Sequence, residues 1–149
     1  MNHHVYLGLG SNLGDRAMLL EQATQLAGER VGEVICQSSF MESEPWGFES
    51  ANRFLNGVIL CETQLAPREV LEATQQIERE LGKGQEHATQ RSQSPAYKDR
   101  PIDIDILLYD DLTTDEPDLK IPHPLMKERD FVMKPLREIE AKLNIKLKF

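Results

Sequence analysis

The sequence has little cysteine, no long apolar run and no basic leader. Only two cysteines occur in 149 residues, and Cys36 and Cys61 lie in separate apolar runs without the spacing of metal ligands. We therefore expect buried thiols in a reducing compartment. No stretch approaches the ~20 apolar residues of a membrane span, and the first ten residues, MNHHVYLGLG, lack the basic and apolar regions of a signal peptide. These absences predict a cytoplasmic protein that does not bind a membrane.

The shortage of positive charge excludes a further class of partner. The formal net charge is −8, whereas nucleic-acid binding depends on clustered Lys and Arg, so we expect no nucleic acid as the main partner. The basic residues gather at 79–100 and 120–137, which favours a small anionic ligand. With 40% hydrophobic and 28% charged residues, the chain is predicted to form one soluble domain over residues 1–149, with no obligate protein partner evident.

Hydrophobic periodicity predicts strands and helices in alternation. The predicted strands are 5–10, 34–40, 54–61 and one within 100–109, and the predicted helices are 16–29 and 67–82. The second helix has Pro67 at its start and Gly82 at its end, as is typical of helix termini. This β-α-β-β-α-β order is the ferredoxin-like arrangement of an α+β fold, followed here by a C-terminal helical extension. The fold alone does not indicate a function.

Two aspartates interrupt the strand RPIDIDILLY at residues 100–109. Because side chains alternate along a strand, Asp103 and Asp105 project from one face and the neighbouring isoleucines from the other. Two carboxylates roughly 6–7 Å apart repel each other unless a cation lies between them. A solvated edge strand is the alternative, but the ILLY flank indicates an interior strand. Two carboxylates with Arg100 nearby suit Mg²⁺ and the oxygens of a polyphosphate.

Two other segments combine aromatic and polar side chains. In FLNGV, Phe54 and Asn56 alternate onto one face, and Trp46 lies in the preceding PWG loop. Together they would form a slot for a flat heterocycle that makes hydrogen bonds. In IPHPLMKERDF, prolines flank His123 and Arg129 follows it, and such a pair near a helix start suits phosphate oxygens. The alternatives are a core Phe with a solvated Asn, and a His and an Arg on the surface.

The glycine-rich stretch GLGSNLG contains Gly8, Gly10 and Gly14 and lies between a predicted strand and a predicted helix. It is similar to a dinucleotide-binding fingerprint, but that fingerprint needs a parallel βαβ unit and a suitably placed acidic residue. The predicted β-α-β-β-α-β order does not supply them. We therefore interpret the stretch as a tight turn that leads into a capped helix.

The motifs GLGSNLGDR, PWG, FLNGV, RPIDIDILLY and IPHPLMKERDFV follow one another as in a known family of enzymes. Over nearly its whole length the sequence resembles the 6-hydroxymethyl-7,8-dihydropterin pyrophosphokinases of folate biosynthesis. The resemblance implies a ferredoxin-like fold and the transfer of a diphosphoryl group from ATP to the pterin hydroxymethyl group, with release of AMP. It also implies two Mg²⁺ ions.

The resemblance further implies roles for individual residues. Asp103 and Asp105 would hold both metal ions, and with Arg100 and Arg129 they are the expected catalytic residues. The expected pterin-binding residues are Ser43 and Trp46, through their backbones, and Phe54, Asn56 and Phe131. The expected ATP-binding residues are Gln75, Glu78, Arg100, Ile106 through its backbone, His123 and Arg129.

The chain departs from the family pattern after the second predicted helix. Many members have GR-x-R there, whereas this chain has GKGQ at 82–85, so the second arginine is missing at Gln85. Arg91 or Lys98 would then supply its charge. Residues 83–99 are polar and lack apolar periodicity, which predicts a loop that orders over ATP and excludes water. A tolerated surface insertion is the alternative.

Two rival functions remain compatible with parts of this pattern. A regulatory ferredoxin-like module that senses a small ligand would not need a D-x-D pair and an arginine facing one cleft. A Mg²⁺-dependent phosphohydrolase would need the metal ligands but no aromatic residues around a heterocycle slot. The combination of both features favours the pyrophosphokinase.

Overall fold

The computed structural model describes residues 2–44, 52–82 and 101–149. In chain order the elements are β1 (His3–Ser11), α1 (Arg16–Arg30), β2 (Gly32–Gln37), β3 (Met41–Ser43), β4 (Phe54–Thr63), α2 (Pro67–Gly82), β5 (Asp103–Tyr109), β6 (Thr114–Glu116), β7 (Leu119–Ile121), the short 3₁₀ turn η1 (Met126–Glu128) and α4 (Asp130–Leu143). In this part of the chain no helix combines the length and the hydropathy needed to cross a membrane.

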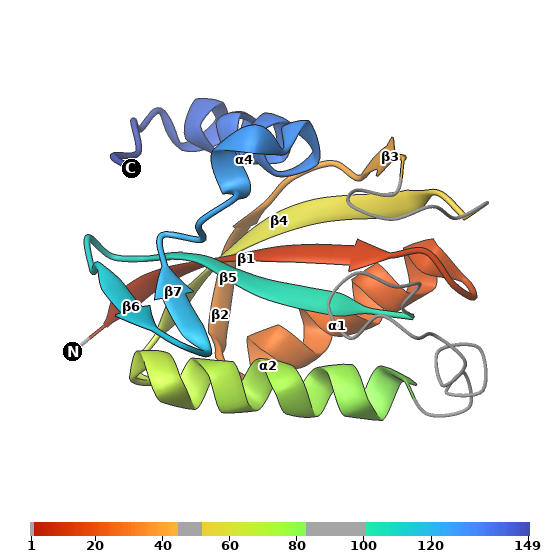
Figure 1. The fold of residues 1–149 in the computed structure, drawn as a ribbon, viewed down its shortest axis with the longest axis horizontal. Coiled ribbons are helices and arrows are strands. Elements are labelled where there is room, and N and C mark those ends of the chain that lie inside the picture. Colours follow the sequence, from red (N-terminus) through yellow and green to blue (C-terminus); the bar gives the residue numbers. More distant parts are fainter. Residues whose placement is uncertain (1, 45–51, 83–100) are drawn as a thin grey trace.

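The strands β2, β4, β1 and β5 form one sheet in that spatial order, and β3 adds to β4. All neighbouring strands are antiparallel. Helices α1 and α2 cover one face of the sheet, whereas α4 lies against the other (Figure 1). The predicted α+β class is confirmed: the six core elements follow the ferredoxin-like βαββαβ order, and α4 is the C-terminal helical extension.

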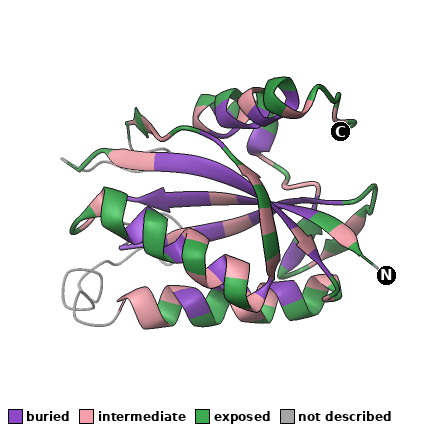
Figure 2. Cartoon of the chain, turned by 180° about the vertical axis from the view of Figure 1, so that it is seen from behind, coloured by how far each residue is buried: buried purple, intermediate pink, exposed green. Residues whose placement is uncertain are grey.

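Two apolar clusters hold these layers together. Leu20 of α1 and Ile77 of α2 are fully buried against one face of the sheet, and Leu136 of α4 is fully buried against the other. Burying one such side chain contributes about 1.5–3 kcal/mol. Strands β1, β4 and β5 are buried along most of their length, whereas β2 is partly exposed (Figure 2). The clusters on both faces therefore fix the positions of the strands that carry polar side chains.

Local signals in the sequence account for the helix boundaries. The Asp15 side chain caps α1 by accepting a hydrogen bond from the Met18 N–H at 3.2 Å. Helix α2 begins at Pro67, as predicted, and the Glu69 carboxylate accepts from the N–H that precedes the helix. Helix α4 ends at Leu143, and the left-handed conformation of the next residue, Asn144, terminates it.

The predicted second strand is wrong in its extent and in its alternation. Strand β2 ends at Gln37, and its register with β4 shifts between Val34 and Cys36. Such a bulge turns successive side chains out of phase, so Val34 packs toward α1 while Cys36 packs toward α4. Cys36 is therefore only half-buried. Cys61 is fully buried as predicted, and its burial raises the pKa of the thiol to about 12.

Two further features differ from the sequence-based expectations. Strand β5 is at an edge of the described sheet rather than in its interior, and its apolar residues are buried because helices cover both faces. The hairpin of β6 and β7 was not predicted, because strands of three residues give no periodic signal. Arg68 of α2 holds this hairpin through ion pairs with Glu116 and with Asp118, the latter at 2.8 Å.

Gly32, the first residue of β2, and Gly28 of α1 should respond oppositely to substitution by alanine. A Cβ at Gly32 would lie 1.9 Å from the Glu62 carbonyl oxygen, whereas a Cβ at Gly28 in α1 would lie 3.6 Å from Val34, an ordinary contact. We expect Gly32→Ala to reduce the free energy of unfolding by about 2 kcal/mol or more. Gly28→Ala should increase it by about 0.5–1 kcal/mol. Urea denaturation measures both, and equal effects would contradict the close packing of β2 on β4.

Candidate active site

The sheet face toward α4 carries both aspartates of β5. The isoleucines that alternate with them pack on the α1 and α2 side, so the predicted separation of the two sets of side chains is confirmed. Asp103 and Asp105 are both half-buried. In the pairing of β1 with β5, Asp103 lies opposite Gly10 and Asp105 opposite Gly8. The strand beside the carboxylates therefore presents no side chains next to them.

The two glycines form a floor of bare backbone between β4 and β5. A Cβ at Gly10 would lie 3.3 Å from Asn56 Oδ1 and 3.5 Å from a ring carbon of Phe54, both on β4. A Cβ at Gly8 would lie 3.3 Å from the Leu107 side chain of β5. We refer to Gly8 and Gly10 as the glycine floor. At both glycines, side chains of β4 or β5 lie close to the position that a Cβ would take.

Sequence reasoning missed the role of these glycines. The interpretation of GLGSNLG as a tight turn holds only for Gly14, whose φ of 75° is left-handed, because Gly8 and Gly10 lie inside β1. Glycine at alternate positions of an otherwise apolar strand was the available signal, since it weakens a strand unless something approaches the backbone closely. The pairing of β1 with β4 and β5 was needed to identify the side chains that lie close to Gly8 and Gly10.

On the β4 side of the glycine floor, Asn56 is held in one orientation. It is buried, and its Nδ2 donates to Ser43 Oγ at 2.9 Å and to the Met41 carbonyl oxygen at 3.2 Å. With both amide hydrogens used by β3, Asn56 Oδ1 faces Gly10 as an acceptor. Phe54 lies half-buried on the same face, as predicted. The Ser43 hydroxyl thus orients Asn56, a role that the sequence did not suggest.

On the β5 side, two basic side chains approach the same carboxylate oxygen. His123 Nε2 and Arg129 Nη1 each lie 4.0 Å from Asp105 Oδ2. Arg129 is the residue that precedes α4, and only 9% of its surface is exposed. The arginine places a buried positive charge beside the aspartates, as an anionic ligand would require.

His123 has a defined orientation and a defined charge. Its backbone N–H donates to the Leu107 carbonyl oxygen at 3.0 Å, and its Nδ1 accepts from the Leu125 N–H at 3.3 Å. Because Nδ1 accepts, the proton of the neutral ring is on Nε2, which faces Asp105. Burial and the nearby charge of Arg129 lower the pKa of His123, and Asp103 opposes them only in part. The imidazole is therefore neutral at pH 7 and can donate a hydrogen bond through Nε2.

Phe131 lies in the first turn of α4 and is half-buried. The guanidinium carbon of Arg129 is 5.7 Å from the centre of its ring. This cation–π contact holds the Phe131 ring close to Arg129, on the β5 side of the site. Phe131 and Phe54 thus come from different elements on the α4 side of the sheet.

The residues expected near the nucleotide lie along the outer edge of β5. Glu78 Oε2 of α2 accepts from the Ile104 N–H at 2.7 Å, and Gln75 is exposed one turn earlier on the helix. The Ile106 side chain is buried in the α1 and α2 cluster. Because Ile104 offers its N–H to α2 and strand backbones alternate in direction, the backbone of Ile106 also faces that edge.

Several predicted residues lie outside the described part of the chain. These are Trp46 and Arg100, and also Gln85, Arg91 and Lys98 of the predicted ATP loop. The structure therefore brings together Ser43, Phe54, Asn56, Asp103, Asp105, His123, Arg129 and Phe131 on the α4 side of the sheet, while Gln75, Glu78 and Ile106 lie along the outer edge of β5.

The donor set at the aspartates fits a hard divalent cation that is also bound by a ligand. Among the described residues, no group of three or more His, Cys, Asp or Glu side chains could hold a metal alone. Mg²⁺ commonly binds one or two carboxylates together with phosphate oxygens and water. Asp103 and Asp105 on one face of β5 match that requirement once a phosphate ligand is present.

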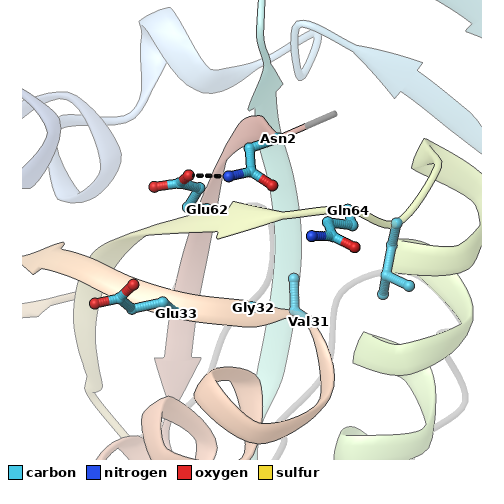
Figure 3. Close-up of a pocket in the computed structure, with 7 residues that line it drawn as sticks. Asn2, Val31, Gly32, Glu33, Glu62 and Gln64 are labelled. Carbon is cyan, nitrogen blue, oxygen red and sulfur yellow. Dashed lines mark hydrogen bonds between the residues drawn. The ribbon is translucent and has the colours of Figure 1, made fainter.

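A separate hollow of about 330 Å³ lies at the opposite end of the sheet, where β4 ends. Its lining residues are Asn2, Val31, Gly32, Glu33, Glu62, Gln64 and Leu65 (Figure 3). The carboxylates of Glu33 and Glu62 come from paired positions of β2 and β4, and Glu62 accepts a hydrogen bond from Asn2. None of the predicted site residues lines this hollow.

Comparison with known proteins agrees with the resemblance in the motifs. The family model of 7,8-dihydro-6-hydroxymethylpterin-pyrophosphokinase matches residues 6–141. The 2-amino-4-hydroxy-6-hydroxymethyldihydropteridine pyrophosphokinase of Porphyromonas gingivalis is 50% identical over 141 residues, which cover 94% of this chain and 92% of that protein. The enzyme of the same name from Bacillus subtilis is 41% identical and is aligned over 93% of this chain and 79% of its own length.

Solved structures share the fold. A crystal structure of HPPK-DHPS in complex with substrates superposes with a TM-score of 0.70 at 15% identity, over 93% of this chain and 40% of that chain. Plasmodium falciparum HPPK-DHPS with pteroate gives a TM-score of 0.68 at 17% identity, over 93% of this chain and 39% of that one. This chain therefore spans about two fifths of those solved chains.

The family model covers most of this chain, and the relatives match it over nearly its full length at substantial identity. The chain belongs to the 7,8-dihydro-6-hydroxymethylpterin-pyrophosphokinase family.

Proposed function

We propose that this chain transfers the diphosphate of ATP to 6-hydroxymethyl-7,8-dihydropterin, giving the pterin diphosphate and AMP. One observation carries the proposal beyond the family match. A single face of the sheet holds an aromatic ring with an oriented amide on one side of the glycine floor, and two carboxylates with a buried arginine on the other. A heterocycle and a polyphosphate could therefore meet over β1.

The β4 side suits the pterin ring. Asn56 Oδ1 can accept a hydrogen bond from a ring N–H or an amino group, because its own amide hydrogens are held by β3. Phe54 and Phe131 supply apolar surface on which a flat ring can stack, as aromatic side chains do with nucleic-acid bases. The backbones of Ser43 and Trp46 complete the proposed pterin contacts.

The β5 side suits the triphosphate. Asp103 and Asp105 would hold two Mg²⁺ ions, which when bound would neutralise phosphate charge and lower the pKa of the attacking hydroxyl. Arg129 supplies a fixed positive charge, and neutral His123 donates through Nε2. Arg100 is the second proposed arginine. The nucleotide would extend along the outer edge of β5 toward Glu78, with its adenine at the Ile106 backbone.

In the proposed reaction the protein mainly positions the pterin hydroxyl and the triphosphate relative to each other. The pterin hydroxyl oxygen bonds to the β-phosphorus, the bond from that phosphorus to the oxygen of the α-phosphate breaks, and AMP leaves with that oxygen. The hydroxyl proton passes to solvent or to the carboxylate of Asp105. Negative charge on the transferred group is stabilised by Arg129 and Arg100, in the manner common to phosphoryl transfer.

One assay distinguishes this function from its rivals. The protein is incubated with ATP and Mg²⁺, with and without the reduced pterin, and AMP, ADP and phosphate are resolved. A pyrophosphokinase forms AMP only when the pterin is present. A phosphohydrolase releases phosphate without the pterin, and a regulatory module leaves ATP unchanged. Either of the last two results would overturn the proposal.

Removing one carboxylate should abolish turnover without unfolding the protein. We expect Asp103→Asn to reduce kcat by roughly a hundredfold or more, because a ligand for the charge-stabilising metal is lost. The change is nearly isosteric and removes repulsion from Asp105, so Tm should not fall. The control is Asp115→Asn in β6, which removes an exposed carboxylate paired with Lys120 and should retain activity. Near-normal turnover by Asp103→Asn at millimolar Mg²⁺ would contradict the metal assignment.

The two phenylalanines should contribute to pterin binding and not to ATP binding. Stacking on an aromatic ring is worth about 1–3 kcal/mol per base, so Phe54→Leu and Phe131→Leu should each weaken pterin affinity roughly tenfold. Calorimetry with the pterin and with an ATP analogue separates the two ligands. Phe149→Leu is the matched control, because Phe149 contacts Lys127 and Arg137 instead. Equal losses for both ligands would show that the rings only pack the core.

A side chain added to the glycine floor should reduce pterin affinity without preventing folding. Gly10→Ala places a methyl group 3.3 Å from Asn56 Oδ1 and 3.5 Å from Phe54, a contact that small shifts can relieve. We expect the variant to fold but to lose about tenfold or more in pterin affinity, since the methyl occupies space above β1. Pterin titration by fluorescence, with circular dichroism to confirm folding, measures this. Unchanged affinity would place the pterin elsewhere.

A further inference from the structure

Strand β3 is the element that orients Asn56, yet it is only three residues long. Met41 and Ser43 pair with Asn56 and Phe54, and Glu42 pairs with Leu55 between them. The Met41 carbonyl and the Ser43 hydroxyl are the two acceptors that hold the Asn56 amide. A strand this short at the end of a sheet depends on further contacts to keep its position.

Arg16 supplies such contacts from the first turn of α1. Its Nη2 donates to Glu42 Oε1 at 2.6 Å, and its Nη1 donates to the Arg53 carbonyl oxygen at 3.0 Å. One planar guanidinium therefore bridges the middle of β3 and the residue that precedes Phe54. Arg53 adds to the network through Glu42 at 3.5 Å and Glu44 at 3.3 Å. The cap that Asp15 makes on α1 fixes the backbone from which Arg16 extends.

Stability does not account for this network, because its members are exposed. About a third of the Arg16 side chain and almost half of the Glu42 side chain are accessible. Exposed ion pairs contribute little to the free energy of unfolding. The hydrogen bond from Arg16 still lowers the pKa of Glu42, so the carboxylate is ionised and the bridge is intact at neutral pH.

We propose that Arg16 is a positioning residue for the pterin side of the site. By holding β3 against the start of β4, it keeps Met41 and Ser43 where they turn Asn56 Oδ1 toward the glycine floor. The inference rests on the proposed function, because Asn56 is assigned to the pterin. In this proposal Arg16 is assigned no contact with either substrate and acts through β3. A lysine at this position would keep the charge but lose the planar fork that reaches two acceptors.

The test compares pterin and ATP-analogue affinities in variants of the full chain. We expect Arg16→Ala to weaken pterin affinity by roughly three- to tenfold, and to leave ATP-analogue affinity within about twofold. Arg16→Lys should restore part of the loss. Glu42→Ala, which removes the other end of the bridge, should reproduce it. The control is Arg68→Ala, since Arg68 makes a comparable pair of exposed ion pairs with the β6–β7 hairpin, and it should change neither affinity.

A double-mutant cycle separates positioning from general loosening of the fold. If Arg16 acts through the Asn56 amide, then Arg16→Ala should cause little further loss of pterin affinity in an Asn56→Ala background. Full additivity of the two losses would overturn the inference, as would equal loss of both ligands or a fall in Tm well beyond that of Arg68→Ala. If the wild-type protein itself binds no pterin, the proposed function fails instead.

Discussion

The alternation of side chains across β1, β4 and β5 is the constraint on which the rest of the site depends. Apolar side chains on one face of these strands are buried by α1 and α2, which commits the intervening positions to the face of α4. On that face β1 contributes Gly8 and Gly10, with Asp103 and Asp105 on one side and Asn56 on the other. A shift of one residue in either pairing would bury the carboxylates and destroy the floor.

In each half of the site, an element outside β1, β4 and β5 orients or supplies the polar side chains. On the β4 side, β3 takes both amide hydrogens of Asn56 and leaves its oxygen for a ligand. On the β5 side, the segment before α4 brings His123 and Arg129 to Asp105. The uncharged imidazole and the permanently charged guanidinium offer different contacts to a phosphate chain. In the proposed function, binding of the heterocycle and binding of the polyphosphate can therefore be altered separately, because different elements orient the residues assigned to each.

Sequence patterns predicted the features that depend on neighbouring residues in the chain. They did not predict the features that depend on how one strand pairs with another. The start of α2 at Pro67 was predicted, because proline favours the first turn of a helix by its own backbone preference. The alternation of side chains along a strand predicted that Asp103 and Asp105 lie on one face of β5. The bulge in β2 and the glycine floor were not predictable, because both are defined by the strand alongside. The roles of individual site residues came from family resemblance, and Arg16 had no motif that linked it to β3.

The most direct test of the account is a crystal structure with Mg²⁺, a non-hydrolysable ATP analogue and 6-hydroxymethyl-7,8-dihydropterin. We expect the pterin ring above Gly10, with Asn56 Oδ1 accepting a hydrogen bond from its edge. We also expect Mg²⁺ between the phosphates and the carboxylates of Asp103 and Asp105. A pterin bound away from Gly10, for example in the hollow between Glu33 and Glu62, or phosphates that do not approach β5, would contradict the account.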